Sequence, residues 1–593
     1  MKSKISWAIA SILMVISLLL VSCGSKGPAT TAASEKPKYG GTATIVFPND
    51  LFVFSPHALP GRFLDDNHLG FVYEQYTNLN WALGSAGTGE THYGELGHTC
   101  VTNWKQVIGY LAESFETPTI GVWILNIRKG VHYGLNPKME ASRLVNGREM
   151  TADDVAWVLN ERKTNPNDYL GVQKGLSQNM VIEKTGPWQV TVKTPVDAGV
   201  AYSFIMGGGG AGSAQYVPEV LQKYGSTNDW HQMVGTGPYM IDDRIEGSST
   251  TFIRNPNYWQ KNPVGPGKGD QLPYPDQIKV LAVPDFSSRL ALLRTGKGDR
   301  VEGLAREDFN SLRATNPELK YHRYLPIPGV ISLRLDNDKL PYKDKRVRQA
   351  LMLAFDYNSM VKDFYKGEAV ALATPVEPIK GNEDVYWPIE TLPEAARTLF
   401  TYDPAKAKQL LAEAGYPTGF KAKVVVKALT PDVDEAEIWK SMWAKVGVDL
   451  EILVTDAGTY TSIWQKRAYE EMEFQNQTDW TALSARYSFA WASGAGGADS
   501  LANVPRGKEP VLTKAFNEMQ TKLWLDPVGA NKIIHDLVPY VVENAFDIPR
   551  AVPYTYRFWQ PWLKNYDGES WTKYWVPYIW VDQDLRQKLT GTR

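Results

Sequence analysis

The chain has 593 residues, of which 43% are apolar and 22% are charged, a composition that excludes a wholly disordered protein. The 63 lysines and arginines are balanced by 65 aspartates and glutamates, and a net charge of −2 argues against a protein that coats nucleic acid. The length allows several domains or two large lobes. Only two cysteines are present, against 20 tryptophans and 30 tyrosines, so the aromatic residues require an explanation.

The N-terminus has the pattern of a secretory signal. Lys2 and Lys4 precede an apolar run from Ile5 to Val21, which ends at small residues. The run is at the short limit for a bilayer-spanning helix, about 20 residues, so an uncleaved anchor is the alternative. Leu-Val-Ser-Cys23 resembles the lipobox of bacterial lipoproteins, in which cleavage precedes a cysteine that carries diacylglycerol. We predict a signal peptide over residues 1–22 and lipid attachment at Cys23.

The segment after the signal cannot contribute to a core. Residues 24–38 contain none of the larger aliphatic or aromatic side chains, so we predict a flexible tether over 23–38 and folded chain from near Tyr39. If Cys23 carries lipid, Cys100 has no partner for an intrachain disulfide. No second long apolar run follows, and we expect the remainder to be soluble.

The chain after the tether alternates strand and helix patterns. Alternating apolar residues over 43–47 predict a strand, and Thr151 is expected to cap a helix whose buried face includes Val155, Val158 and Leu159. An amphipathic stripe over 347–355 and the Asp403–Gly415 segment predict two further helices. Strand, helix and strand patterns over 422–428, 435–446 and 448–454 then predict a βαβ unit with a parallel strand pair.

Sequence motifs of catalysis and metal binding are scarce. We find no serine-hydrolase elbow, zinc-protease motif, paired-cysteine motif or phosphate-binding loop, and the glycine run 207–210 is interpreted as a loop. His92, His98 and Cys100 could ligate a transition metal, but the glycine-rich segment around them favours a polar surface loop. We therefore expect neither an enzyme nor a resident cofactor.

Several stretches, in order along the chain, resemble one protein family. They are Tyr39-Gly-Gly-Thr, Gly109-Tyr-Leu-Ala-Glu-Ser-Phe, Leu125-Asn-Ile-Arg-Lys-Gly-Val, Asn146-Gly-Arg-Glu-Met-Thr-Ala-Asp-Asp-Val, Gly235-Thr-Gly-Pro-Tyr, Arg254-Asn-Pro-Asn-Tyr-Trp, Lys345-Arg-Val-Arg-Gln-Ala-Leu and Tyr402-Asp-Pro-Ala-Lys-Ala-Lys-Gln-Leu-Leu. Together they resemble the solute-binding proteins of family 5, also called cluster C, which serve oligopeptide, dipeptide and nickel ABC importers.

This resemblance implies a two-lobed α/β protein of the periplasmic-binding-protein type II fold, with an extra subdomain in lobe I. It places lobe I at 39–325, with the extra subdomain at about 60–200, and lobe II at 326–546. A C-terminal segment, 547–593, returns into lobe I. The lobes of such proteins close around a solute by hinge motion. The implied protein is a monomer, is held at the membrane by its lipid, and delivers its solute to an ABC permease.

The resemblance also directs attention to the late part of lobe II. Asp479 lies close to the position where peptide-binding members pair an aspartate with the ammonium group of the peptide; it is assigned equally to binding an amine or hydroxyl of the ligand and to a solvated loop. The residues that follow, 484–497, depart from the family pattern, which weakens the case for a peptide. Trp480 and Trp491 lie in this stretch and are assigned equally to a ligand cleft or to the core. Tyr460 and Trp464 are four residues apart and would share a helix face. We predict ligand binding by Tyr460, Asp479, Trp480, Trp491 and Arg550.

The return segment carries an arginine, Arg550, where the family usually presents an apolar or aromatic residue to the cleft. A buried guanidinium there would suit a carboxylate of the ligand, and a surface salt bridge is the favoured alternative. Five more tryptophans lie near the C-terminus, at 559, 562, 571, 575 and 580, and most of the tryptophans, including Trp439 and Trp443, are expected in the core.

From these features we predict an extracytoplasmic lipoprotein, in a periplasm or at a cell exterior, that captures a peptide-like or other organic solute for an ABC importer. An oligosaccharide ligand and a sensor that feeds a signalling partner are the alternatives. A lipid-anchored hydrolase is the third, and the lack of catalytic motifs disfavours it.

Overall fold

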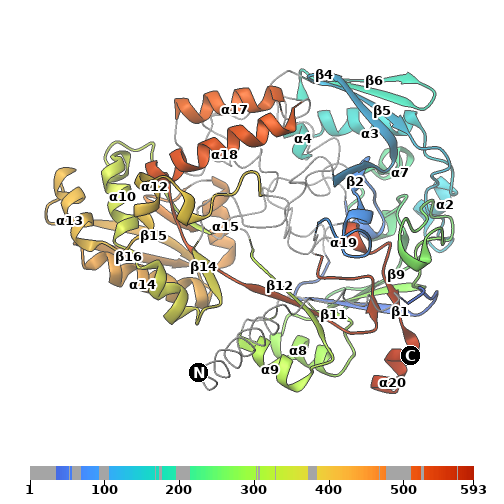
Figure 1. Ribbon diagram of the computed structural model, residues 1–593. Helices are drawn as coiled ribbons and strands as arrows, with labels where there is room; N and C mark the ends of the chain where they lie inside the picture. The colour runs from blue at the N-terminus through green and yellow to red at the C-terminus, as the bar shows by residue number, and fades with distance from the viewer. Residues whose placement is uncertain are drawn as a thin grey trace, which may run out of the picture.

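Figure 1 shows a computed structural model of the chain, and the described residues are 35–51, 54–55, 69–91, 106–166, 168–172, 177–194, 214–301, 304, 307–326, 329–371, 383–466, 468–475, 509–522, 526–569 and 572–593. These residues form a mixed α/β structure with a large sheet in each of two lobes. Each lobe and the extra subdomain encloses an apolar core of its own.

A seven-stranded sheet organises lobe I. Its strands, in spatial order, are β12 (Lys320–Tyr324), β20 (Thr555–Trp559), β11 (Arg300–Val301), β1 (Thr42–Phe47), β10 (Gln277–Ala282), β9 (Ser249–Arg254) and β8 (Tyr239–Ile245). The N-terminal strand β1 is parallel to β10 and β11, whereas the C-terminal strand β20 runs antiparallel to both β11 and β12. Lobe I is therefore completed by residues from the two ends of the chain.

Smaller elements surround this sheet. They are β2 (Thr77–Leu79), β3 (Val107–Gly109), α8 (Phe286–Arg294), α9 (Glu307–Thr315), β21 (Leu563–Lys564), α19 (Thr572–Trp575), β22 (Trp580–Val581) and α20 (Gln583–Thr590). The extra subdomain is a four-stranded antiparallel sheet of β4 (Ala112–Thr119), β5 (Val122–Ile127), β7 (Gln189–Lys193) and β6 (Val181–Gly186), with α2 (Glu140–Val145), α3 (Ala152–Thr164), α4 (Tyr169–Val172) and α7 (Pro218–Tyr224).

Lobe II is built on a five-stranded sheet in the order β16 (Val448–Thr455), β15 (Phe420–Lys427), β17 (Met472–Gln475), β13 (Val330–Leu333) and β18 (Asp547–Pro549). Its helices include α10 (Lys345–Leu353), α12 (Glu394–Arg397), α13 (Pro404–Glu413), α14 (Thr430–Ala444), α15 (Ala457–Lys466), α17 (Pro510–Lys522) and α18 (Pro527–Asn544). A short ladder of β14 (Ala369–Ala371) and β19 (Ala551–Pro553) lies beside it. In Figure 1 the elements α10, α13, α14, β15 and β16 lie together on the left, apart from the blue and green elements of lobe I, and a red strand of the C-terminal segment connects the two parts.

The predicted helices and strands that fall on described residues are confirmed, with shifted ends. The parallel βαβ unit exists as β15, α14 and β16, although α14 begins at Thr430, five residues before the predicted start. Helix α10 ends at Leu353, so the last two positions of the predicted stripe follow the helix. In α13 the buried residues are Ala407 and Leu411, whereas Leu410 and Ala414 are half-buried.

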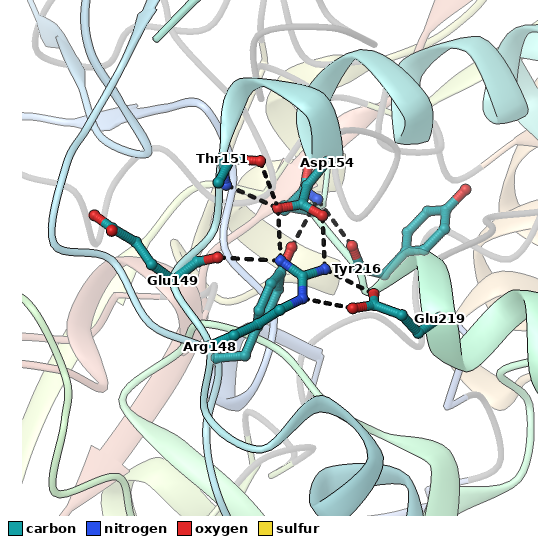
Figure 2. A network of polar contacts seen from close by, with 8 residues as sticks. Arg148, Glu149, Thr151, Asp154, Tyr216 and Glu219 are labelled. Atoms are coloured by element: carbon teal, nitrogen blue, oxygen red, sulfur yellow. Dashed lines mark hydrogen bonds and ion pairs between the residues drawn. The ribbon is translucent and has the colours of Figure 1, made fainter. Parts of the chain in front are cut away.

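The family motif around Arg148 proves to be structural. Thr151 and Asp154 form a capping box at the start of α3, with the Thr151 amide donating to Asp154 Oδ2 at 2.8 Å. Arg148 donates to Asp154 and also to Glu219 on α7, both at 2.7 Å through Nη2 (Figure 2). One guanidinium thus joins two helices of the extra subdomain.

Most of the described tryptophans are core residues, as predicted. Trp439 and Trp443 are fully buried in lobe II, and Trp559, Trp562, Trp575 and Trp580 are buried in lobe I. Trp464 is half-buried on α15, whose helical conformation places it on one face with Tyr460, as expected.

No helix within the described ranges combines the length and the hydropathy that a bilayer crossing needs. The apolar run of the predicted signal lies outside those ranges. The proposed boundaries of the lobes and the tether stay predictions.

Candidate functional site at the carboxyl edge of the lobe II sheet

The most promising site begins where the parallel strands of lobe II end. Strands β15 and β17 are parallel and finish at Lys427 and Gln475 on the same edge of the sheet. Strand β18 is antiparallel to β13 and therefore runs in the direction of β15 and β17; it reaches the same edge at Pro549, and Arg550 follows it. Ligands of open α/β sheets bind outside the carboxyl ends of parallel strands, so this edge is the part of lobe II best placed to meet a solute.

Arg550 is held at this edge by two carboxylates of α14. Its Nε donates to Glu435 Oε1 at 3.2 Å, and Nη2 donates to Glu435 Oε2 at 2.6 Å and to Asp432 Oδ1 at 3.1 Å. The guanidinium carbon also lies 3.7 Å from the centre of the Phe474 ring. Arg550 is only 4% exposed, so the expected alternative of a surface salt bridge is wrong: the ion pair is buried.

Helix α14 supplies this pair because its first turns start at the end of β15. Asp432 and Glu435 are three residues apart and therefore lie on one face of the helix, which turns toward Arg550. Glu435 is shared further: it accepts a bond from the Tyr365 hydroxyl at 2.8 Å and one from Trp439 Nε1 at 3.2 Å. The backbone of Arg550 is fixed as well, since its amide donates to the Gly329 carbonyl at 2.9 Å.

A second hydroxyl closes the site on the side of β17. Tyr460 on α15 donates to the Phe474 carbonyl at 3.0 Å, and the buried carboxylate of Glu473 interacts electrostatically with the same tyrosine. Tyr460, predicted as a ligand-binding residue, thus lies within the same neighbourhood as Arg550, which interacts with it electrostatically.

Burial and charge act together on these groups. Burial by itself would lower the pKa of Arg550, but the neighbouring carboxylates of Glu435 and Asp432 hold that pKa above its ordinary value. Burial also raises the pKa of Tyr365 and of Tyr460, and the adjacent carboxylates raise both further. Each hydroxyl therefore keeps its proton and serves as a donor at neutral pH.

The charge balance bears on the predicted role of Arg550. Its guanidinium already faces two carboxylates, and Glu473 adds a third acidic group nearby, so the described part of this edge is formally acidic. A carboxylate ligand would have to compete with Glu435 and Asp432 for the same guanidinium. Binding of a ligand carboxylate by Arg550 stays a prediction, and this arrangement does not favour it.

The other predicted site residues lie outside the described residues. They are Cys23, Asp479, Trp480 and Trp491, together with His92, His98 and Cys100. Asp479 follows the last residue of β17 by four positions in the sequence. Among the described residues, no group of three or more histidine, cysteine, aspartate or glutamate side chains is arranged to hold a metal ion.

Sequence reasoning missed a buried acid in lobe I, Glu74. Its Oε1 accepts from the Tyr258 hydroxyl at 2.8 Å, and its Oε2 accepts from Trp259 Nε1 at 3.0 Å. Tyr110 contacts Tyr258 at 2.9 Å between the two hydroxyls. Burial raises the pKa of Glu74 to about 7. Tyr110, Tyr258 and Trp259 all belong to the family motifs quoted above. A search for one polar residue that serves these three side chains would have been the way to find Glu74.

Comparisons with known proteins agree with this architecture. A family model described as "Bacterial extracellular solute-binding proteins, family 5 Middle" matches residues 106–498. Heme-binding protein A of Haemophilus influenzae is 27% identical over 381 residues, which are 61% of this chain and 63% of that protein. Glutathione-binding protein GsiB of Salmonella typhimurium is 26% identical over 393 residues, 65% of this chain and 68% of that protein. The alignment thus spans less than two thirds of the first relative.

Solved structures cover nearly the whole chain. DppA of Helicobacter pylori, a periplasmic binding protein in complex with the peptide STSA, superposes with a TM-score of 0.68 at 19% identity, covering 92% of this chain and 99% of DppA. NikA of Brucella suis in complex with Fe(III)-EDTA gives a TM-score of 0.65 at 19% identity, covering 91% of this chain and 100% of NikA. At these identities the likeness establishes the fold, which is that of type II periplasmic binding proteins.

Proposed function

Because the chain belongs to the bacterial extracellular solute-binding proteins of family 5, we propose that it captures a peptide-like or other organic solute between its two lobes and delivers it to an ABC permease. It acts outside the cytoplasm and carries out no chemistry on the solute. The curated relatives named above bind heme and glutathione, and DppA was solved with a peptide, so the family accommodates organic solutes of several kinds.

The observation that carries this proposal is the position of the buried polar cluster. Arg550, Glu435, Tyr365 and Tyr460 lie at the carboxyl edge of the lobe II sheet, and Arg550 directly follows β18 where the chain turns back toward lobe I. A solute bound outside this edge would contact the part of lobe II that adjoins the connection between lobes. Closure of the lobes would then bury the solute.

A screen of solutes tests the proposal directly. The protein without its first 22 residues is mixed in turn with the peptide Ser-Thr-Ser-Ala, glutathione, heme, Fe(III)-EDTA and a linear oligosaccharide. A solute present at 100 times its Kd stabilises the folded state by about 2.7 kcal/mol, so a true ligand raises the melting temperature measurably. We expect one class to do so, to reduce the radius of gyration in X-ray scattering, and to be recovered unchanged.

Each outcome has a meaning. A shift with the oligosaccharide alone would favour the saccharide alternative, and conversion of the solute would contradict a binding role. If no class changes either the melting temperature or the radius of gyration, the capture proposal is wrong for these solutes. A solute that closes the lobes but is not transported by the importer would favour the sensor role.

We further propose that Cys23 is lipidated and anchors the protein to the membrane. The support is the basic, apolar and small-residue pattern of the first 23 residues. Two acyl chains on one residue give stable anchoring, whereas a single chain binds only marginally. In cells given radiolabelled fatty acid, Cys23→Ala should abolish the label, while Cys100→Ala should retain it. Label retained on Cys23→Ala would refute this assignment.

A further inference from the structure

The chain crosses between the lobes twice, and the lobe I strands at the two crossings, β12 and β20, are paired neighbours. One crossing runs from the end of β12 at Tyr324 to the start of β13 at Val330, and the other runs from the end of β19 at Pro553 to the start of β20 at Thr555. Tyr324 and Thr555 are register partners in the antiparallel β12–β20 ladder. In Figure 1 these two strands run together toward lobe II, which makes them the natural axis of a lobe movement.

A residue of lobe II contacts both of these strands. Glu368, which directly precedes β14, accepts a hydrogen bond from the Tyr556 hydroxyl of β20. The same oxygen, Oε2, lies 3.4 Å from Nη1 of Arg323 on β12. The Glu368 carbonyl accepts the amide of Tyr554 at 2.9 Å, inside the second crossing. One lobe II residue therefore joins the two strands of lobe I through its side chain and the crossing through its backbone.

The local backbone aims Glu368 at this place. The helical turn Met360–Phe364 ends shortly before Glu368. Lys366 and Gly367 then both adopt left-handed conformations, with φ of 54° and 80°. The reversal sends the next residue toward the crossing and starts β14, which pairs with β19. The position of the Glu368 backbone is thus set by this turn.

The same turn connects the crossing to the candidate site. Tyr365, three residues before Glu368, donates to Glu435, which in turn holds Arg550. Any displacement of Arg550 or Glu435 by a solute would therefore act on the segment that carries Glu368.

We propose that Glu368, with Tyr556 and Arg323, is a hinge latch that stabilises the lobe angle seen in this structure, and that solute binding changes this angle against the latch. The inference rests on the proposed capture function, since it assumes that lobe movement matters for binding. The ion pair is partly exposed, with 36% of the Glu368 side chain and 44% of the Arg323 side chain accessible, so its contribution is modest. A modest contribution suits a switch, because a strong one would lock the lobes.

The test measures the lobe angle without any solute. Nitroxide labels are placed at Lys268→Cys in lobe I and Lys408→Cys in lobe II, on a chain with Cys100→Ser that begins after Cys23, and the distance distribution is recorded by pulsed electron resonance. In Glu368→Ala the ratio of populations should shift by roughly three- to tenfold away from the wild-type distance, as expected for loss of one hydrogen bond and one exposed ion pair.

The matched control is Glu451→Ala, which removes the same type of charge from an exposed pair with Lys423 inside lobe II. It should leave the distribution unchanged. Tyr556→Phe and Glu368→Gln provide the same test should the alanine variant fold poorly, and each is expected to shift the distribution in the same direction. Distributions identical to wild type in all folded latch variants would overturn the latch. Because no solute is present, failure of every solute to bind would refute the capture function and leave this result intact.

Discussion

Arg550 places a full positive charge inside lobe II, where a charge removed from water costs several kcal/mol unless it is paired. Glu435 and Asp432 provide that pairing, and the Phe474 ring covers the guanidinium. The pair is therefore both a structural tie between α14 and the return segment and a candidate determinant of the site.

Removal of this single charge should be costly. Arg550→Met keeps the length of the side chain but leaves Glu435 and Asp432 buried without their cation, so we expect a loss of about 3–5 kcal/mol in the free energy of unfolding. Urea denaturation followed by tryptophan fluorescence measures it. The control, Lys343→Met, removes a cation from the exposed pair with Asp338 and should unfold like wild type. An Arg550→Met protein of wild-type stability would show that the buried pair is dispensable.

Two buried acids make the stability of the protein depend on pH. Burial raises the pKa to about 7 for Glu74 in lobe I and for Asp547 in lobe II, from ordinary values of 4.5 and 3.8. Because the folded state holds each proton more tightly than the unfolded state does, the stabilisation is present at low pH and is lost as the pH rises through about 7. Over the full interval between the unfolded and folded pKa values, the change is about 3 kcal/mol for Glu74 and about 4 kcal/mol for Asp547.

We therefore expect the melting temperature to fall between pH 5.5 and pH 8. Glu74→Gln and Asp547→Asn mimic the protonated acids, and each should flatten this fall, most of all in combination. Scanning calorimetry at several pH values measures the slope. A double variant with the same slope as wild type would mean that other groups cause the dependence.

At the scale of elements, the family motifs act by joining helices and turns. Gly235 belongs to one of them, and a Cβ there would lie 2.1 Å from the Val72 carbonyl oxygen. A glycine is therefore required by the close approach of the segment that contains Val72. The Asn255 side chain of a second motif donates to the Gly237 carbonyl at 2.9 Å, which ties the two motifs together.

The contact of Arg148 with Asp154 and Glu219, shown in Figure 2, leads to a prediction at the scale of elements. A lysine cannot present the fork that meets Asp154 on α3 and Glu219 on α7 together, so Arg148→Lys should cost roughly 1–2 kcal/mol. Amide hydrogen exchange should accelerate in the first turn of α3. Arg143→Lys on α2, whose side chain is exposed, is the control and should leave exchange unchanged. Equal exchange in both variants would contradict the proposed tie.

At the scale of the whole molecule, lobe I is not a continuous piece of chain, whereas the strands of the lobe II sheet all fall within one stretch from β13 to β18. Strand β20 lies between β12 and β11 in the lobe I sheet, and β18 is the last strand of the lobe II sheet, next to β13. The C-terminal residues are therefore part of both lobes.

Deletion of residues 555–593 tests this interdependence. The truncated chain lacks β20, and its loss exposes the edges of β11 and β12, so we expect aggregation or loss of cooperative unfolding. Deletion of only the last three residues, which follow α20, should leave a single cooperative transition in calorimetry. A folded, monomeric 555–593 deletion would show that lobe I does not need its C-terminal strand.

Local physical chemistry made much of this protein predictable. The cap at Thr151, the Asp403–Pro404 helix start and the βαβ pattern over 420–455 depend on neighbours within a few residues, so the sequence predicted them and only their ends moved. The family motifs likewise led to the correct two-lobed fold, because each reports a local turn or cap that this fold requires.

The tertiary structure decided what those patterns could not specify. Arg550 meets Glu435 across 115 positions and Glu74 meets Trp259 across 185, and no periodicity links residues so far apart. Whether Arg550 would face a ligand, water or buried carboxylates depended on how α14 packs against the return segment. The sequence by itself determined the elements and the family; only the fold, by bringing distant charges into one low-dielectric interior, decided which of them are paired.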